Sequence, residues 1–259
     1  MLLAIDIGNT HTVVGLFSGD TLAGHWRMSS AAHRTGDESW LTIRSFCLNN
    51  GIDPSKIRLV GISSVVPNLT EVFATIASRY VGVSPHIVGA GTIPGMNIRY
   101  HDPASVGADR LCNAVAGFTK YGGPLIIVDF GTATTFDIID VQGDYLGGVI
   151  CLGVESSAAE LHRRAARLPK VELIFPESVV ARDTVSSIQA GLMIGTVESV
   201  EGIVRRIREE IGHQAGVIAT GGLAPVIAKH TDIIQAIEPS LVLEGIRLIV
   251  ERTIAERQV

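Results

Sequence analysis

The chain has 259 residues, a formal net charge of −5 and 46% hydrophobic residues, which fits a globular protein of one large domain or two smaller ones. It contains only four lysines and no run of basic residues, so we expect no nucleic-acid partner. No apolar stretch reaches the roughly 18 residues of a membrane helix, and neither a signal peptide nor a metal-binding cysteine pair is apparent. We therefore expect a cytoplasmic protein without a membrane partner.

The first half of the chain alternates apolar segments with turn residues. Strands are expected where short apolar or alternating runs end at turn residues, and helices where apolar residues recur every three or four positions. In chain order, the predicted elements are strands over 2–7, 10–17 and 21–28, a helix over 37–51, a strand over 59–66, a helix over 68–80, a strand over 86–90 and a helix over 107–118.

The second half repeats this order. Its predicted elements are strands over 125–130, 134–140 and 145–150, a long helix over about 185–211, a strand over 216–222 and a closing helix that begins at 239–240. The repetition predicts an internal duplication, with an N-terminal domain over 1–118 and a C-terminal domain over 119–259. The abundance of Gly, Val, Ile and Ala indicates an α/β interior.

An acidic residue ends the first strand of each half. Asp6 precedes Ile-Gly-Asn-Thr, and Asp129 precedes Phe-Gly-Thr. Such a hairpin surrounds a small concavity with backbone amides and hydroxyls that suit an anion, and the carboxylate beside it can hold a hydrated Mg²⁺. Taken alone, Gly8-Asn9 is an ordinary hairpin turn. An aspartate at the end of a buried apolar strand, repeated in both halves, favours phosphate binding.

The two hairpins together resemble the nucleotide-phosphate clamp of actin, hexokinase and the chaperone ATPases. The stretch 218–223 is a strand that ends in Gly-Gly before a helix, and it matches the element against which adenosine lies in that clamp, although a Gly-Gly turn is common. No P-loop motif is present. The stretch 89–95 is predicted to be a loop rather than a dinucleotide fingerprint, because its last glycine comes one place late and Pro94 opposes a helix.

Asp109 lies near the start of an apolar-striped helix. A carboxylate there can simply complement the helix dipole, worth about 0.3–1 kcal/mol, or it can act as a general base that accepts the proton of an attacking hydroxyl. Spacing alone slightly favours the dipole. The neighbouring Arg110 is either a solvated surface residue or a forked clamp for a carboxylate or phosphate.

The chain closely resembles the type III pantothenate kinases, bacterial enzymes of the first step of coenzyme A synthesis. The resemblance covers essentially the whole chain in the family's order, and the combination of GADR with DFGTATTFD is specific. The matching stretches are AIDIGNTHTVVGLF, HWRM, RTGDE, ISSVVP, NIRYHDP, VGADRL, GGPLIIVDFGTATTFD, YLGGVI, AARLP, IATGGLAP and LEGIRLI.

This resemblance implies duplicated ribonuclease H-like (actin-like ATPase) domains, each a mixed five-stranded sheet flanked by helices, with the active-site cleft between them. The implied reaction is ATP-dependent phosphorylation of pantothenate to 4′-phosphopantothenate, with ATP, Mg²⁺ and a monovalent cation (K⁺ or NH₄⁺), in a homodimer. Two alternatives stay open. A kinase for another small hydroxy acid or sugar is disfavoured by GADR, and an inactive nucleotide-sensing regulator by the presence of Asp6, Asp109 and Asp129.

Residue roles are implied by the same resemblance. Asp109 is implied as the proton acceptor, which overturns the slight preference for a dipole role, and Asp129 as the residue that binds the monovalent cation. The residues implied to contact ATP are Asp6, Ile7, Gly8, Asn9, Thr10, His11, Thr12, Val13 and Thr132. The residues implied to contact pantothenate are Tyr100, Gly107, Ala108, Asp109, Arg110 and, at the dimer interface, Thr184.

Thr184 is also a good candidate for the N-cap of the long helix, and both roles can hold together. Three places depart from the family pattern. Leu152-Gly153 stands where Pro-Gly is usual, Ala-Arg-Asp-Thr at 181–184 where Gly-Arg-Asn-Thr is usual, and His11 where Asn is commoner. The first two concern loops on the pantothenate side, and they leave both hairpins and Asp109 unchanged.

Overall fold

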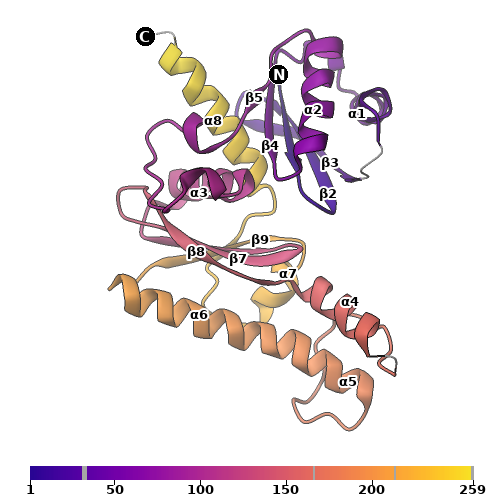
Figure 1. Cartoon of the computed structure of the whole chain (residues 1–259), viewed down its shortest axis with the longest axis vertical. Helices are drawn as coiled ribbons and strands as arrows, with labels where there is room; N and C mark the ends of the chain where they lie inside the picture. Colours follow the sequence, from indigo (N-terminus) through magenta and orange to yellow (C-terminus); the bar gives the residue numbers. More distant parts are fainter. Residues whose placement is uncertain (31–33, 166, 213, 258–259) are drawn as a thin grey trace. The chain divides into compact units, whose positions relative to one another are not determined.

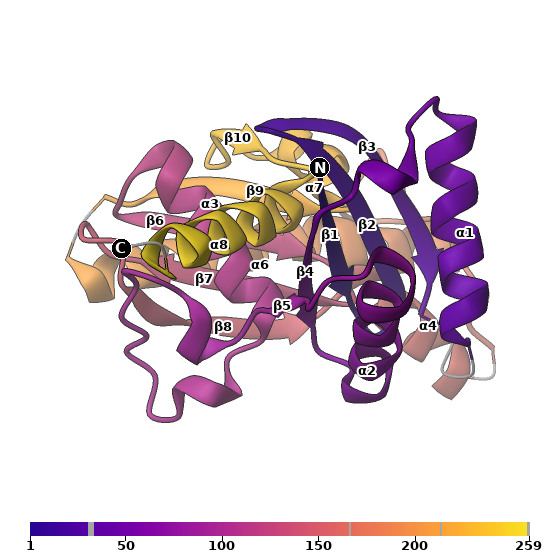
Figure 2. The same cartoon turned by 90° about the horizontal axis from the view of Figure 1, so that it is seen from above.

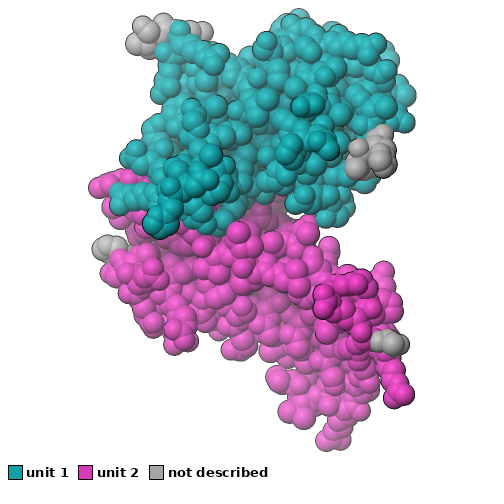
Figure 3. All heavy atoms as spheres, in the orientation of Figure 1, with its two compact units in different colours: residues 1–120, 240–259 teal, residues 121–239 magenta. Residues whose placement is uncertain are grey.

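The computed structural model describes residues 1–30, 34–165, 167–212 and 214–257, and the chain forms two compact units. Unit 1 comprises Met1–Lys120 and Ser240–Val259, and unit 2 comprises Tyr121–Pro239 (Figure 3). The chain therefore passes from one unit to the other twice, after residue 120 and after residue 239. The stretch 165–169, which carries part of the family resemblance, includes residue 166, which lies outside the described residues.

Unit 1 is built on a mixed five-stranded sheet of order β3-β2-β1-β4-β5. Its strands are β1 (Leu2–Ile7), β2 (His11–Ser18), β3 (Thr21–Ser29), β4 (Leu59–Ser64) and β5 (His86–Ile87). The central strand β1 pairs antiparallel with β2 and parallel with β4. The five strands predicted in the first half of the chain are thus confirmed.

Helices flank this sheet (Figures 1 and 2). They are α1 (Gly36–Asn49), α2 (Pro67–Ile76) with a π-helical turn at Ala77–Val81, α3 (Ala108–Tyr121), α8 (Leu241–Arg257) and 3-10 turns at Pro54–Lys56, Ala90–Thr92 and Pro103–Ser105. The helices predicted over 37–51, 68–80 and 107–118 are confirmed.

Alternation along β1 decides which side chains face which helices. Leu3, Ile5 and Ile7 are buried in one cluster with residues of α1 and α2. Because successive side chains of a strand point to opposite faces, Asp6 lies on the other face. There α8 packs against β1, β2 and β4.

Helices α3 and α8 cross in backbone contact. A Cβ placed on Gly245 of α8 would lie 2.1 Å from the carbonyl oxygen of Cys112 in α3, so only glycine fits at this crossing. Farther along, Arg252 Nη2 donates to Thr119 Oγ1 at 2.8 Å. The position of α3 is therefore tied to that of α8.

The closing helix joins unit 1, whereas the sequence predicts it in a C-terminal domain of 119–259. Leu243 and Ile246 of α8 lie over glycines of the sheet: a Cβ on Gly15 would meet Leu243 Cδ1 at 2.7 Å, and one on Gly61 would meet Ile246 Cγ2 at 2.5 Å. This close packing places α8 with the first sheet. The passage between the units also comes two residues later than the predicted boundary at 118.

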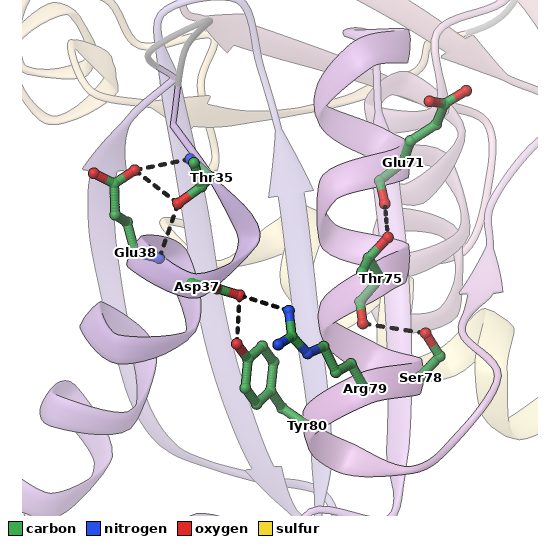
Figure 4. Close-up of polar contacts among 8 residues, drawn as sticks. All are labelled: Thr35, Asp37, Glu38, Glu71, Thr75, Ser78, Arg79 and Tyr80. Atoms are coloured by element: carbon green, nitrogen blue, oxygen red, sulfur yellow. Dashed lines mark hydrogen bonds and ion pairs between the residues drawn. The ribbon is translucent and has the colours of Figure 1, made fainter.

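The RTGDE stretch forms the start of α1 and its tie to the end of α2 (Figure 4). Thr35 caps the helix in a capping box with Glu38, whose carboxylate accepts from the Thr35 backbone amide at 2.8 Å. Asp37 accepts from Arg79 Nη1 at 3.1 Å and from the Tyr80 hydroxyl. These contacts give the stretch a structural role in unit 1.

Unit 2 repeats the sheet of unit 1 in the order β10-β9-β6-β7-β8. Its strands are β6 (Leu125–Phe130), β7 (Ala133–Ile139), β8 (Tyr145–Leu152), β9 (Gly216–Gly221) and β10 (Ala236–Ile237). Like β1, the central β6 pairs antiparallel with the next strand and parallel with the strand that follows the helices. The shared connectivity agrees with the predicted duplication.

The helices of unit 2 include one that the sequence did not predict. They are α4 (Val154–Arg164), α5 (Thr184–Gln189), a π-helical segment Ala190–Ile194, α6 (Gly195–Ile211), α7 (Ala224–Ile227) and a 3-10 turn Ala228–His230. The segment predicted over 185–211 is helical throughout and ends at Gly212 in the left-handed conformation. α4 was not predicted: its apolar stripe is short, with Val154 buried and Ala158 packed against the core, and most of its other residues are polar or charged. Among the described helices, none is both long and apolar enough to cross a membrane.

Candidate active site

The first acidic hairpin lies at the carboxyl end of β1. Asp6 is partly buried and stands opposite Val13 of β2 and Ser63 of β4. The turn closes with a hydrogen bond from the Gly8 amide to the His11 carbonyl oxygen at 3.0 Å. Its four residues, 8–11, connect Ile7 to Thr12 in the strand register.

The side chains of this hairpin divide by exposure. Asn9, Thr10 and His11 are exposed, whereas Thr12 is only 1% exposed. The hydroxyl of Thr12 lies 2.9 Å from that of Ser30, and the Ser30 amide donates to the Thr10 carbonyl oxygen at 3.0 Å. The end of β3 thus supports the turn, and Thr12 has a structural contact that the sequence did not predict.

Asp109 occupies the second position of α3, as predicted. It is partly buried, and its Oδ1 accepts from the Arg110 amide at 2.9 Å. Burial raises the pKa of this carboxyl above its ordinary value of 3.8, although the amide and the guanidinium of Arg110 act in the opposite direction. A Cβ on Gly107 would lie 2.5 Å from Asp109 Oδ1, so the glycine leaves room for the carboxylate.

Asp109 lies near the end of β1 that carries Asp6. A Cβ on Gly107 would lie 2.5 Å from Asp109 Oδ1 and 3.5 Å from Val65 Cγ1, and the Val65 amide donates to the carbonyl oxygen of Ile7 at 3.0 Å. Cys112, one helical turn after Asp109, is fully buried. Burial raises the pKa of its thiol well above the ordinary value, and the charges of Asp6 and Asp109 raise it further. Unit 1 therefore brings the strand-end carboxylate and the predicted base to one place.

The remaining predicted residues of unit 1 lie in or before α3. Ala108 and Arg110 are buried, with Arg110 only 7% exposed, which excludes the solvated-arginine interpretation. Tyr100 is partly buried in the segment that leads to the 3-10 turn Pro103–Ser105.

The second acidic hairpin ends β6 and is one residue shorter. Asp129 stands opposite Thr135 of β7 and Thr220 of β9, and the turn closes with a hydrogen bond from the Gly131 amide to the Ala133 carbonyl oxygen at 3.1 Å. The carbonyl oxygen of Thr132 faces α4: it accepts from the Gly153 amide at 3.1 Å and from the Ser156 hydroxyl at 2.8 Å.

Two glycines are required beside this hairpin. A Cβ on Gly153 would lie 2.3 Å from the Gly131 carbonyl oxygen, so glycine is needed at this position. Leu152, which stands where the family usually has Pro, is 62% exposed. Gly221, from the predicted Gly-Gly element, has φ +91°, and its Cβ would lie 2.6 Å from both Asp129 Oδ1 and the Phe130 carbonyl oxygen. A side chain at position 221 would therefore clash with both oxygens.

Thr184 is not the cap that the sequence allowed. It is the first residue of α5, and the N-cap is Asp183, whose Oδ1 accepts from the Ser186 amide at 2.9 Å. Thr184 is exposed in a shallow surface depression that Arg182 and Ser187 also line. The capping role therefore belongs to Asp183, one of the residues at which the chain departs from the family pattern.

No protein-only metal cage occurs in the described ranges, because no group of three or more His, Cys, Asp or Glu side chains is arranged to hold an ion there. The acidic hairpins instead offer one carboxylate each, beside backbone or hydroxyl oxygens. Such a donor set fits Mg²⁺, which keeps several waters and binds through one or two carboxylates and substrate phosphates.

Comparison with known proteins identifies the family. The model of the type III pantothenate kinase family matches residues 2–206. A type III pantothenate kinase of Moorella thermoacetica is 46% identical over 252 residues, 97% of this chain and 99% of the relative.

Solved structures at low identity share the fold. The activator of 2-hydroxyisocaproyl-CoA dehydratase from Clostridium difficile, with bound ADPNP, has a TM-score of 0.55 at 14% identity, covering 100% of this chain and 97% of that one. (R)-2-Hydroxyglutaryl-CoA dehydratase component A of Acidaminococcus fermentans has a TM-score of 0.57 at 12% identity, covering 98% of each chain. They support the duplicated ribonuclease H-like fold predicted from the sequence. With the family model spanning most of the chain and a near-full-length relative at 46% identity, the chain belongs to the type III pantothenate kinase family.

Proposed function

We propose that this chain transfers the γ-phosphoryl group of ATP to the primary hydroxyl of pantothenate, and that Asp109 accepts the proton of that hydroxyl. The observation that supports this proposal is the placement of Asp109 beside Val65, whose amide bonds to the end of β1 next to Asp6. A phosphate-type hairpin and a partly buried carboxylate are thereby near each other, as phosphoryl transfer to an alcohol requires.

Asp109 suits the role of base because of its surroundings. Burial raises its pKa, which moves it towards the operating pH, where a general base is most effective. The hydrogen bond from the Arg110 amide and the space left by Gly107 hold the carboxylate in place. In phosphoryl transfer most of the remaining catalysis is positioning and electrostatic stabilisation.

The nucleotide is proposed to contact both hairpins. Residues Asp6–Val13 provide a turn with exposed Asn9, Thr10 and His11, whose hydroxyl, amide and ring groups are available to phosphate oxygens. Asp6 is the proposed Mg²⁺ ligand in unit 1, and Thr132 the contact from unit 2. Bound Mg²⁺ supplies charge neutralisation for the transferring phosphoryl group.

A monovalent cation, K⁺ or NH₄⁺, is proposed beside Asp129. The Asp129 carboxylate and the Phe130 carbonyl oxygen, which both lie beside Gly221, are oxygen ligands of the kind such a cation accepts. The cation would offset phosphate charge in a chain that has only four lysines.

Pantothenate is proposed to lie against Tyr100, Gly107–Arg110 and Thr184. Arg110 is buried, and a guanidinium held there can pair with the carboxylate of pantothenate in two parallel hydrogen bonds. Thr184 is exposed and has no capping role, which leaves its hydroxyl for a ligand. We also propose that the protein is a cytoplasmic homodimer, in which Thr184 lies at the interface.

The proposal is tested by a coupled assay of ADP release with and without pantothenate. We expect release to depend on pantothenate, and Asp109→Asn to lower turnover by at least about 100-fold while ATP still binds. Asp53→Asn is the matched control, because Asp53 is an exposed acid that also accepts a backbone amide at a helix start, from Ser55 at 2.9 Å. We expect the rate of ADP release to be lower in Na⁺ than in K⁺.

Each alternative has its own outcome in this assay. Near-normal turnover of Asp109→Asn would remove the base assignment. ADP release with a sugar or another hydroxy acid, and not with pantothenate, would favour a different acceptor. ATP binding without any ADP release would favour the regulator, and indifference to the cation would remove Asp129 from the cation site.

A further inference from the structure

Ser63 lies fully buried beside the carboxylate of Asp6. The two residues are register partners in the parallel pair of β1 and β4, and Ser63 Oγ donates to Asp6 Oδ1 at 2.8 Å. Ser63 is 0% exposed, so it touches neither solvent nor substrate. It lies in the ISSVVP stretch of the family resemblance, for which the sequence predicts no role.

The hydrogen bond between Ser63 and Asp6 has one possible direction. An ionised carboxylate can only accept, and a serine hydroxyl has a single proton to donate, so that proton goes to Asp6. The hydroxyl oxygen is then left as an acceptor. The hydrogen bond therefore runs from Ser63 Oγ–H in β4 to Asp6 Oδ1 in β1.

A buried hydroxyl residue takes the same place in the other unit. Thr220, 5% exposed, is the register partner of Asp129 in the parallel pair of β6 and β9. In both halves the aspartate that ends the central strand thus has a buried serine or threonine next to it. Two occurrences of this arrangement argue that the hydroxyl serves the aspartate.

We propose that Ser63 is a positioning residue, which fixes the rotation of the Asp6 carboxylate so that it meets the Mg²⁺ of bound Mg·ATP. This inference rests on the proposed function. The terminal torsion of an aspartate is broad, so a donor on one carboxylate oxygen restricts its rotation. Outer contacts of this kind typically change metal affinity by about 10- to 100-fold when they are removed.

Calorimetric titration with ATP, in Mg²⁺ and separately in EDTA, measures this effect without turnover. We expect Ser63→Ala to weaken binding in Mg²⁺ by about 10-fold or more and to leave binding in EDTA unchanged. Ser63→Thr keeps the hydroxyl and should restore most of the Mg²⁺-dependent affinity. In steady-state kinetics the KM for Mg·ATP should rise more than the KM for pantothenate.

Ser39→Ala is the matched control. Ser39 is also a 0% exposed serine of unit 1, but its hydroxyl has no hydrogen-bond partner among the described residues, so its loss should leave both titrations unchanged. Ser63→Cys replaces the hydroxyl by a weaker donor and should weaken the Mg²⁺-dependent binding in the same direction by a smaller factor. It carries the test if Ser63→Ala does not fold.

Two results would overturn the inference. One is that Ser63→Ala, or Ser63→Cys in its place, binds ATP in Mg²⁺ within about twofold of wild type. The other is that Ser39→Ala loses as much affinity as Ser63→Ala. Failure of the proposed function looks different. In that case the wild-type chain itself would release no ADP in response to pantothenate, whatever the Ser63 variants do in the titrations.

Discussion

The carboxyl group of Asp109 is harder to ionise than one in water. Its burial disfavours the charged form, so the pKa in the folded chain lies above the ordinary value of 3.8. An unfolded chain returns the group to about 3.9. Above both pKa values the charged carboxylate therefore opposes folding, and this opposition disappears as the pH falls below the unfolded pKa. The residue that suits catalysis is thus unfavourable for stability.

Asp109→Asn should consequently be at least as stable as the wild type at neutral pH. The variant removes a charge whose burial opposes folding, and its advantage should shrink between about pH 7.5 and pH 4. Thermal unfolding of both proteins at several pH values measures the difference. A variant that is clearly less stable at about pH 7.5, and equally so at about pH 4, would show that the carboxylate stabilises the helix start instead.

At the scale of elements, the position of the base depends on a helix that has no catalytic residue of its own. Helix α3 carries Asp109 and Cys112, and α8 crosses it at Gly245 with the two backbones in contact. A side chain at that crossing would have to push against main-chain atoms of α3, which cannot rotate away as a flexible side chain can. The geometry of the site is therefore set partly by the packing of α8.

Gly245→Ala should lower both stability and turnover. The added methyl meets the Cys112 carbonyl oxygen at 2.1 Å, and such overpacking typically costs about 1–3 kcal/mol. Displacement of α3 would also move Asp109. Thermal unfolding and the ADP-release assay measure the two effects.

Gly202→Ala is the control for this change, because Gly202 lies inside α6 with nothing within 4 Å of its added Cβ. Alanine there should stabilise the chain by about 0.5–1 kcal/mol through helix propensity. If Gly245→Ala behaved like Gly202→Ala, the crossing would not be the constraint we describe.

At the scale of the whole molecule, the two units repeat one sheet plan with local differences. The alternating runs and turn residues were enough to predict β1–β3 and β6–β8, and the repetition itself pointed to Asp6 and Asp129. The pairing of Ser63 with Asp6 depends on the register of two strands that are 57 residues apart, which no local pattern specifies. The packing of α8 on unit 1 depends on Gly15 and Gly61, a tertiary fit that helix periodicity does not contain. The cap at Asp183 instead of Thr184 is a shift of one residue at a helix start.

The surface of unit 2 supports the proposed homodimer. Val179 and Val180 are 68% and 81% exposed, and Ile150 and Leu152 of the edge strand β8 are 63% and 62% exposed. Exposed apolar neighbours such as Val179 with Val180 are residues that a second copy of the chain could cover. Light scattering should therefore give twice the chain mass of 27.5 kDa, and Val180→Asp should shift the protein towards the monomer.

Val141→Asp is the matched control for this prediction. Val141 is 58% exposed in the turn between β7 and β8, and we expect its replacement to leave the mass unchanged. A wild-type mass of 27.5 kDa would contradict the dimer.

The placement of α8 also has a consequence for biosynthesis. Residues 1–120 emerge from the ribosome first, yet their sheet lacks the cover of one face until the segment from Ser240 onwards has been made. Unit 2, by contrast, is one uninterrupted stretch of chain. During translation the later unit can therefore complete its own core before the earlier one does, and a nascent chain stalled near residue 239 would expose the apolar face of its first sheet to chaperones.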